Sequence, residues 1–295
     1  MSVWLPGAPC TPRGCVEPTA TAVAVPRAVL RLAGVAVLVL AAVVLVPCGR
    51  WIPGGAVRRW CRWVVRAAGV RVRIAGAAAP SGGLLLVANH ISWLDVPLLS
   101  AVRPARMLAK AEIRRWPVAG PLAARGGALF IERDRLRALP ETVARIAGEL
   151  ERGAAVAVFP EGSTWCGRAQ GTFRRAVFQA ALDAGVPVQP VRIRYRTDRG
   201  TPATAPAFVG DDTLLASLWR VASARRLLAD VEVLPPIPPG RHTDRRALAA
   251  AAQPGECTGG PRHAAPRGVH ERAVASPRPV SRASLRYESS RASRS

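Results

Sequence analysis

The stretch Gly83-Leu84-Leu85-Leu86-Val87-Ala88 decides the fold. An uncharged apolar run of this length is typical of a β-strand rather than a complete helix. A strand that is apolar on both faces belongs in the interior of a parallel sheet, where helices cover both sides. Residues 154–159 (AAVAVF) repeat the pattern. The two stretches therefore predict an α/β domain built on a buried, mostly parallel sheet.

Apolar runs of strand length alternate with helical patterns on both sides of these two stretches. Further strands are expected at 70–75, 105–109, 127–132, 188–195 and 230–234. Helices are expected at 93–101, 134–150, 172–184 and 212–229. The alternation indicates a mostly parallel or mixed sheet flanked by helices, and it extends over residues 69–240.

A long apolar segment precedes this domain. Residues 1–26 show no periodicity and are expected to form a loose extension. Residues 28–46 are apolar except for Arg31, which is close to the length needed to cross a bilayer. A signal peptide has a similar basic start and apolar middle, but Pro47-Cys48 is a poor cleavage or lipidation site. We therefore expect an N-terminal membrane helix, and assign residues 27–68 to a membrane anchor and an amphipathic helix.

The amphipathic part of this region is residues 55–68. Trp60, Trp63 and Val64 recur at helical spacing, and so do the arginines of the same stretch. Such a helix can lie in the membrane interface, or it can be a surface helix packed on the domain. The sequence supports both interpretations equally.

The net charge of +23 allows two kinds of partner, nucleic acid and anionic membrane surfaces. Lys110 is the only lysine among 42 basic residues, so part of the arginine excess reflects a compositional habit rather than a partner. We expect no nucleic-acid partner. Residues 241–295 are rich in Arg, Ser, Pro and Ala, and predict a disordered basic tail. The six cysteines are scattered without metal-site spacing, so no metal site is expected.

One histidine stands in a position suited to chemistry. His90 directly follows the strand 83–88, and ligands bind at the carboxyl ends of strands in open α/β sheets. Asp95 can fold back onto the imidazole if a turn leads into the first helical residues. A carboxylate on one ring nitrogen fixes the tautomer and makes the other nitrogen a better base. On spacing alone, two capping residues without chemistry are the favoured interpretation of the pair.

Polar residues also follow other strands. The segment Phe159-Pro160-Glu161-Gly162-Ser163 directly follows residues 154–159, and Pro160 and Gly162 favour a turn with Glu161 at its tip. Ser163 is a poor nucleophile candidate, because the G-x-S-x-G pattern is absent. Lys110 and Arg133 end two further strands and could together bind a phosphate.

These segments together resemble the lysophosphatidic acid acyltransferase family. Its first block, Asn-His with Asp five residues after the His, corresponds to Asn89, His90 and Asp95. The Gly-rich second block corresponds to residues 126–133, and Phe-Pro-Glu-Gly-Thr/Ser to residues 159–163. The fourth, a Val-Pro-Val/Ile-x-Pro stretch, corresponds to residues 186–190. A lone Asn-His…Asp pattern is weak, whereas four blocks in order overturn the capping interpretation of His90.

The resemblance implies the glycerolipid acyltransferase fold and an enzyme without a cofactor. His90, oriented by Asp95, would take the proton from a glycerol hydroxyl, which would attack the thioester of acyl-CoA or acyl carrier protein. Arg133 would bind the acceptor phosphate together with Lys110. Glu161 and Gly162 would shape the acceptor pocket. The expected location is the cell membrane, with the catalytic domain facing the cytoplasm.

The implied acceptor is 1-acyl-glycerol-3-phosphate, acylated at its sn-2 hydroxyl to give phosphatidic acid. Glu132 beside Arg133 and the Arg-rich tail depart from the family pattern and leave the acceptor open. Related enzymes acylate lyso-ornithine lipids, which gives an alternative within the same chemistry. A further alternative is a basic membrane-binding protein that has lost catalysis.

Overall fold

The sheet of the domain is mixed, as the sequence predicted. The computed structural model describes residues 7–17, 24–45, 51–132 and 135–255. In this part the strand order is β1-β7-β6-β2-β5-β3-β4, and every neighbouring pair is parallel except β6 with β7. The strands are β1 Val70–Ala75, β2 Leu84–Ala88, β3 Arg106–Lys110, β4 Leu129–Ile131, β5 Ala155–Val158, β6 Val188–Arg196 and β7 Leu227–Val233.

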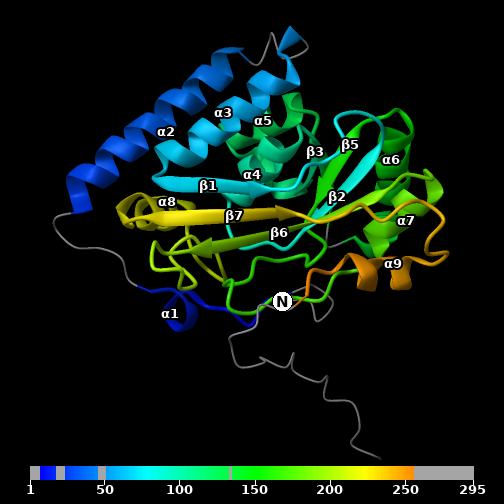
Figure 1. Ribbon diagram of the computed structural model, residues 1–295. Coiled ribbons are helices and arrows are strands. Elements are labelled where there is room, and N and C mark those ends of the chain that lie inside the picture. Colours follow the sequence, from blue (N-terminus) through cyan, green and yellow to red (C-terminus); the bar gives the residue numbers. More distant parts are fainter. Residues whose placement is uncertain (1–6, 18–23, 46–50, 133–134, 256–295) are drawn as a thin grey trace, which may run out of the picture. The chain divides into compact units, whose positions relative to one another are not determined.

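Helices cover both faces of this sheet (Figure 1). They are α1 Pro12–Cys15, α2 Val25–Leu45, α3 Gly54–Ala67, α4 Asp95–Val102, α5 Ala119–Arg125, α6 Leu139–Glu151, α7 Ala176–Asp183, α8 Leu214–Ser223 and α9 Arg245–Ala252. Two short 3-10 helices, Ala111–Arg115 and Leu136–Ala138, lie between them. The helices expected at 93–101, 134–150, 172–184 and 212–229 correspond to α4, α6, α7 and α8.

The deciding stretch forms β2, and all five of its residues are buried. Its side chains alternate between two apolar clusters, because successive residues of a strand point to opposite faces. Leu84 and Leu86 join the cluster that contains α3 and α4, whereas Leu85 and Val87 join the cluster that contains α6, α7 and α9. This two-sided burial explains why the strand contains no polar residue.

Helix boundaries differ from the expected ones at the start of α7, which is Ala176 rather than 172, at the start of α6 and at the end of α8. α6 begins at Leu139 rather than at 134, and Pro140 stands in its first turn, where proline is well tolerated. α8 ends at Ser223 rather than at 229, because Ala224 is extended and Arg226 has a positive φ of 51°. The residues after this turn form β7, which alternates buried and half-exposed side chains.

The predicted tail at 241–295 begins too early. Asp244 accepts hydrogen bonds from the N–H groups of Arg246 and Ala247, and this N-cap starts α9. Leu248, Ala249 and Ala252 are buried in the same cluster as α6 and α7. The packed domain therefore extends to residue 255 at least, and residues 256–295 lie outside the described part of the chain.

The N-terminal extension is also more ordered than predicted. Residues 7–17 contain the short helix α1, and Cys10 is buried in the main cluster. The helix α2 that follows is long and apolar enough to cross a membrane by length and composition. α3 packs on α4 through its buried residues Cys61, Val64 and Val65, while its arginines face outward. The structure thus shows that α3 packs on the domain through its apolar face, and a contact of its exposed arginines with the membrane interface stays a prediction.

Candidate active site

The segment after β2 begins with a side chain that takes part in the sheet. Asn89 donates from Nδ2 to the carbonyl of Ile193 at 2.9 Å and accepts from the Ile193 N–H at Oδ1 at 2.8 Å. This pair of bonds continues the β2–β6 pairing by one residue through a side chain. The chain is thereby fixed to β6 at the point where it turns away toward His90.

Asp95 folds back onto His90, as the sequence predicted. It is the first residue of α4, and its Oδ2 lies 2.9 Å from Nδ1 of His90. The same oxygen accepts the backbone N–H groups of Ile91 at 2.6 Å and Ser92 at 2.8 Å. The turn between the two residues therefore closes around the carboxylate, which explains how a spacing of five brings them together. The Asp95 side chain is fully buried, whereas that of His90 is 21% exposed.

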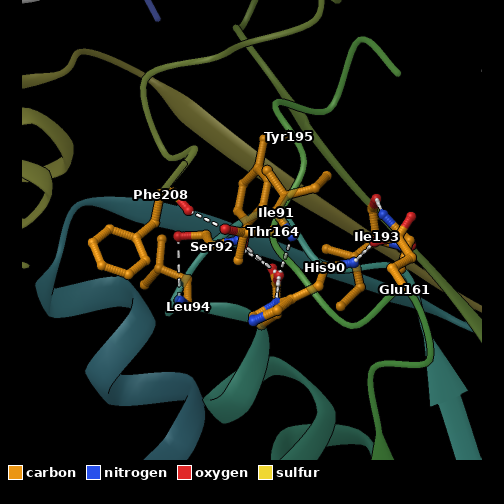
Figure 2. A network of polar contacts seen from close by, with 11 residues as sticks. His90, Ile91, Ser92, Leu94, Glu161, Thr164, Ile193, Tyr195 and Phe208 are labelled. Carbon is orange, nitrogen blue, oxygen red and sulfur yellow. Dashed lines mark hydrogen bonds and ion pairs between the residues drawn. The ribbon is translucent and has the colours of Figure 1, made fainter. Parts of the chain in front are cut away.

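Tyr195 completes the contacts of Asp95, and sequence reasoning did not select it. Its hydroxyl donates to Oδ1 of Asp95 at 2.6 Å, and Figure 2 shows its ring on the side of the network opposite His90. Burial, reinforced by the charge of Asp95, raises the pKa of Tyr195 well above its ordinary value. Alternation along β6 places Val191, Ile193 and Tyr195 on one buried face, so a phenol ending that face was a usable signal.

Glu161 supports the His90 turn from the neighbouring strand. The turn after β5 carries it, and Gly162, whose N–H closes the turn on the Phe159 carbonyl at 3.1 Å, has a φ of +77°, which glycine adopts without strain. Glu161 accepts the His90 N–H at 2.7 Å through Oε2 and the Gly171 N–H at 2.9 Å through Oε1. Burial raises the pKa of Glu161 to about 8, although both N–H groups oppose this change. Glu161 therefore contacts the backbone of His90, not its imidazole.

Further contacts join the loop after β5 to the His90 turn. The rings of Phe159 and His90 stack at a centroid distance of 4.0 Å and an angle of 12°. The Trp165 N–H donates to the carbonyl of His90 at 2.8 Å. The Thr164 hydroxyl donates to the carbonyl of Phe208 (Figure 2). The backbone N–H of Phe208 donates to the carbonyl of Ile91. The imidazole is thus held by one carboxylate, one aromatic ring and a loop bonded to its own backbone.

The two predicted phosphate-binding residues have different outcomes. Lys110 is exposed at the carboxyl end of β3, and its register partner in β4 is Ile131. β5 lies between β3 and β2, so Lys110 shares the sheet edge with His90 at a distance of two strands. Arg133 lies outside the described residues. The structure therefore brings His90, Asp95 and Glu161 together and leaves the pairing of Lys110 with Arg133 a prediction.

The arrangement suits proton transfer. Since Nδ1 of His90 is bound to Asp95, the tautomer that donates from Nδ1 leaves Nε2 as the proton acceptor. The His90 side chain is partly exposed, so it is not closed off from solvent. A buried carboxylate with several donors keeps its position when the imidazole gains a proton.

Comparisons with known proteins show which family the chain resembles. Residues 69–194 match the family model described as Acyltransferase. The chain is 41% identical over 233 residues to a lyso-ornithine lipid O-acyltransferase of Pseudomonas aeruginosa, covering 76% of this chain and 88% of that one. It is 37% identical over 175 residues to a 1-acyl-sn-glycerol-3-phosphate acyltransferase of Neisseria gonorrhoeae, covering 59% and 68%.

A solved structure shares the fold. The acyltransferase PlsC of Thermotoga maritima superposes with a TM-score of 0.53 at 19% identity, covering 75% of this chain and 92% of that chain. At this identity the likeness concerns the fold alone. It agrees with the mixed sheet and flanking helices described above.

Proposed function

Because this chain belongs to the family of lysophosphatidic acid acyltransferases and related lyso-lipid acyltransferases, we propose that it transfers an acyl group from an acyl thioester to a lyso-lipid hydroxyl, with His90 as the general base. One observation carries the proposal: the buried carboxylate of Asp95 binds Nδ1 of a partly exposed His90 at 2.9 Å. The donor is acyl-CoA or acyl carrier protein. The reaction needs no cofactor.

The chemical step follows from the two ring nitrogens. Nε2 of His90 takes the hydroxyl proton while the hydroxyl oxygen forms a bond to the thioester carbonyl carbon. The tetrahedral intermediate collapses, the carbon–sulfur bond breaks, and the thiolate leaves with the proton held by His90. Asp95 stabilises the imidazolium between these steps. The attack is direct, so no acyl-enzyme forms.

The remaining predicted residues act around this centre. Glu161 and Gly162 hold the His90 backbone and the turn beside it, and so shape the acceptor side of the site. Lys110, at the same sheet edge as His90, and Arg133 provide cations for an anionic acceptor. In this proposal Glu161 positions the base rather than exchanging a proton with substrate.

Two acceptors are supported by different observations. The relative from Pseudomonas aeruginosa, whose name specifies lyso-ornithine lipid, is matched over 88% of its length, which favours that acceptor. The Gly-rich block ending in Arg133 favours 1-acyl-glycerol-3-phosphate, acylated to phosphatidic acid. We place lyso-ornithine lipid first, because the match to that relative extends well beyond the motifs.

We also propose that α2 lies in one leaflet of the membrane instead of crossing it. The segment before α2 is bonded to the domain, since the Glu17 N–H donates to Thr204 Oγ1 at 3.1 Å. The segment after α2 forms α3, which packs on α4. Both ends of α2 therefore return to the same domain. Arg58, Arg59 and Arg62 line an open hollow on α3 and are suited to anionic headgroups.

The test is an acyl-transfer assay with purified full-length protein, labelled acyl-CoA and acyl carrier protein, and lysophosphatidate and lyso-ornithine lipid as acceptors. We expect transfer to at least one acceptor in the wild type and its loss in His90→Ala. Absence of transfer with every combination would refute the enzymatic proposal.

The same panel separates the acceptors. Transfer that is faster to lyso-ornithine lipid than to lysophosphatidate, and unaffected by Arg133→Ala, supports the first acceptor. It would also exclude phosphate binding by Arg133. Faster transfer to lysophosphatidate, with a raised KM for it in Arg133→Ala, supports the second.

A further inference from the structure

Three cysteines that are far apart in the sequence meet beside the active-site loop. The Sγ atoms of Cys10, Cys15 and Cys166 all lie within 4.8 Å of one another. Cys10 and Cys166 are buried, and Cys15 is half-buried. Cys10 precedes the short helix α1, Cys15 is its last residue, and Cys166 lies in the loop that carries Glu161. Sequence reasoning treated these thiols as scattered, because the third is about 150 residues from the other two in the chain.

We propose that Cys10, Cys15 and Cys166 form a site for a thiophilic cation, with Zn²⁺ as the matching ion. Thiolate sulfur is the ligand type that selects zinc over hard cations such as Mg²⁺ and Ca²⁺. In a tetrahedral zinc site the Zn–S bonds are about 2.3 Å, which places sulfur atoms about 3.8 Å apart. Closing the present triangle to that size requires a movement of about 1 Å, which a cysteine reaches by a small χ1 adjustment. Water or an added ligand takes the fourth position.

The sulfur of Cys166 already has polar contacts on the side of the cluster. It is hydrogen-bonded to the Cys10 thiol and to the backbone N–H groups of Arg168 and Ala169. Zinc binds cysteine as the thiolate, so a cation at this site displaces the thiol protons. The half-buried Cys15 leaves a path to solvent.

The site would fasten the N-terminal segment to the catalytic loop. Trp165, which precedes Cys166, donates its backbone N–H to the carbonyl of His90. Glu17, two residues beyond Cys15, pairs with Arg168 on the same loop. A metal here joins residues 10–15 to the loop of Glu161 without touching the reacting atoms. Its role is structural, and it does not depend on which lipid the enzyme acylates.

The experiment measures metal binding directly. Reduced, chelator-treated full-length protein is titrated with Zn²⁺ against a chromophoric chelator, and with Co²⁺, whose bonds to thiolate give a charge-transfer absorption. We expect one high-affinity ion per chain, a sulfur-to-cobalt absorption band, and a rise in thermal midpoint on zinc addition. Cys15→Ser, at the most exposed ligand, should weaken zinc binding by roughly 100-fold while leaving the fold intact.

Two matched variants complete the test. Cys61→Ser removes a buried thiol on α3, outside the cluster, and should bind zinc like the wild type. Cys166→Ser should lose the cobalt band. Equal zinc affinity in the wild type, Cys15→Ser and Cys166→Ser would overturn the proposal. So would a Cys10–Cys166 disulfide in the isolated protein, detected by mass after alkylation without reduction, if it persisted under mild reduction.

Discussion

The turn around Asp95 and the helix α2 are opposite in how they place polar and apolar groups. Around Asp95, a carboxylate, a phenol, an imidazole and several backbone N–H groups are buried and bonded to one another. Along α2, only Ala28 and Val35 are buried, while Leu30, Val37 and Leu40 are 76%, 66% and 64% exposed. One region keeps polar groups from water, and the other presents apolar groups outward.

The difference indicates where each region obtains its stability. A buried polar network is favourable only when each of its members is hydrogen-bonded. The conformation of the Asp95 turn is therefore determined by groups of the protein itself. A surface that remains apolar after folding requires a non-aqueous partner. At the start of α2, Arg27 and Arg31 donate to backbone carbonyls at the end of α8, and further along the helix the Leu38 carbonyl accepts the indole N–H of Trp60 on α3 at 3.3 Å. Catalysis should therefore respond to changes at Asp95, and membrane binding to changes on α2.

The largest effect is expected for His90→Ala, which removes the proposed base. General-base catalysis contributes about 10²- to 10⁴-fold, and kcat for acyl transfer should fall by that factor. Thermal unfolding should also shift to lower temperature, because Asp95 loses its imidazole contact and Phe159 loses its stacking partner. His242→Ala, in the loop before α9, is the matched control and should retain full activity. If His90→Ala retained the wild-type kcat, the buried network around Asp95 would have no part in catalysis.

Most residues of the Asp95 network were predicted from the sequence, and the structure shows why. β2 and β5 are apolar on both faces, which identifies them as central strands, and the residues after them must lie at one edge. Asp95 was placed correctly because a turn into a helix start is a local structure. Tyr195 was missed because its contact with Asp95 depends on the β2–β6 pairing, which local sequence does not determine.

The next effect concerns pH and Glu161. Its pKa is raised from 4.5 to about 8 by burial, so the folded state retains the proton between these values and the unfolded state loses it. The stabilisation is complete below pH 4.5 and is lost as pH rises through 8. In Glu161→Gln this titration is absent. The difference in unfolding free energy between wild type and Glu161→Gln should therefore decrease by about 4 kcal/mol from pH 4.5 to 9.

Chemical denaturation at several pH values measures this difference. Subtracting the two proteins at each pH removes the contribution of other titrating groups. A constant difference across the range would mean that Glu161 is ionised in the folded state, held by the N–H groups of His90 and Gly171.

A smaller effect is expected for Tyr195→Phe. The substitution keeps the ring and removes one donor to Oδ1 of Asp95, leaving a buried acceptor unpaired. We expect a loss of about 2 kcal/mol in unfolding free energy, and a kcat reduced severalfold with an unchanged KM. Stopped assays across substrate concentration separate the two parameters. A raised KM with an unchanged kcat would place Tyr195 in substrate binding instead of in the positioning of Asp95.

Sequence reasoning was less successful at the two ends of the domain. The residues of α9 are mostly alanine and arginine, which give a weak helical pattern, and the helix depends on the Asp244 cap and on contacts with distant α7. Cys10 and Cys15 show no recognisable metal-site spacing, because the third cysteine of the cluster, Cys166, comes from the loop after β5. Both features arise from tertiary contacts, which composition and periodicity do not reveal.

The smallest effect, on vesicle binding, tests the other side of the comparison. Leu30, Val37, Leu40 and Val44 are separated by intervals that place them on one face of α2, and all are exposed. Val37→Glu puts a charge in the middle of that face, and should weaken binding to anionic phospholipid vesicles by about tenfold, measured by co-sedimentation. kcat with detergent-dispersed acceptor should not change, because Val37 is remote from the Asp95 network. Ala251→Glu adds the same charge to the exposed side of α9 and should bind vesicles as the wild type does. If Val37→Glu and Ala251→Glu bound vesicles equally well, the outward apolar face of α2 would need a partner other than lipid. Membrane binding could then no longer be assigned to α2 in contrast to catalysis at the Asp95 turn.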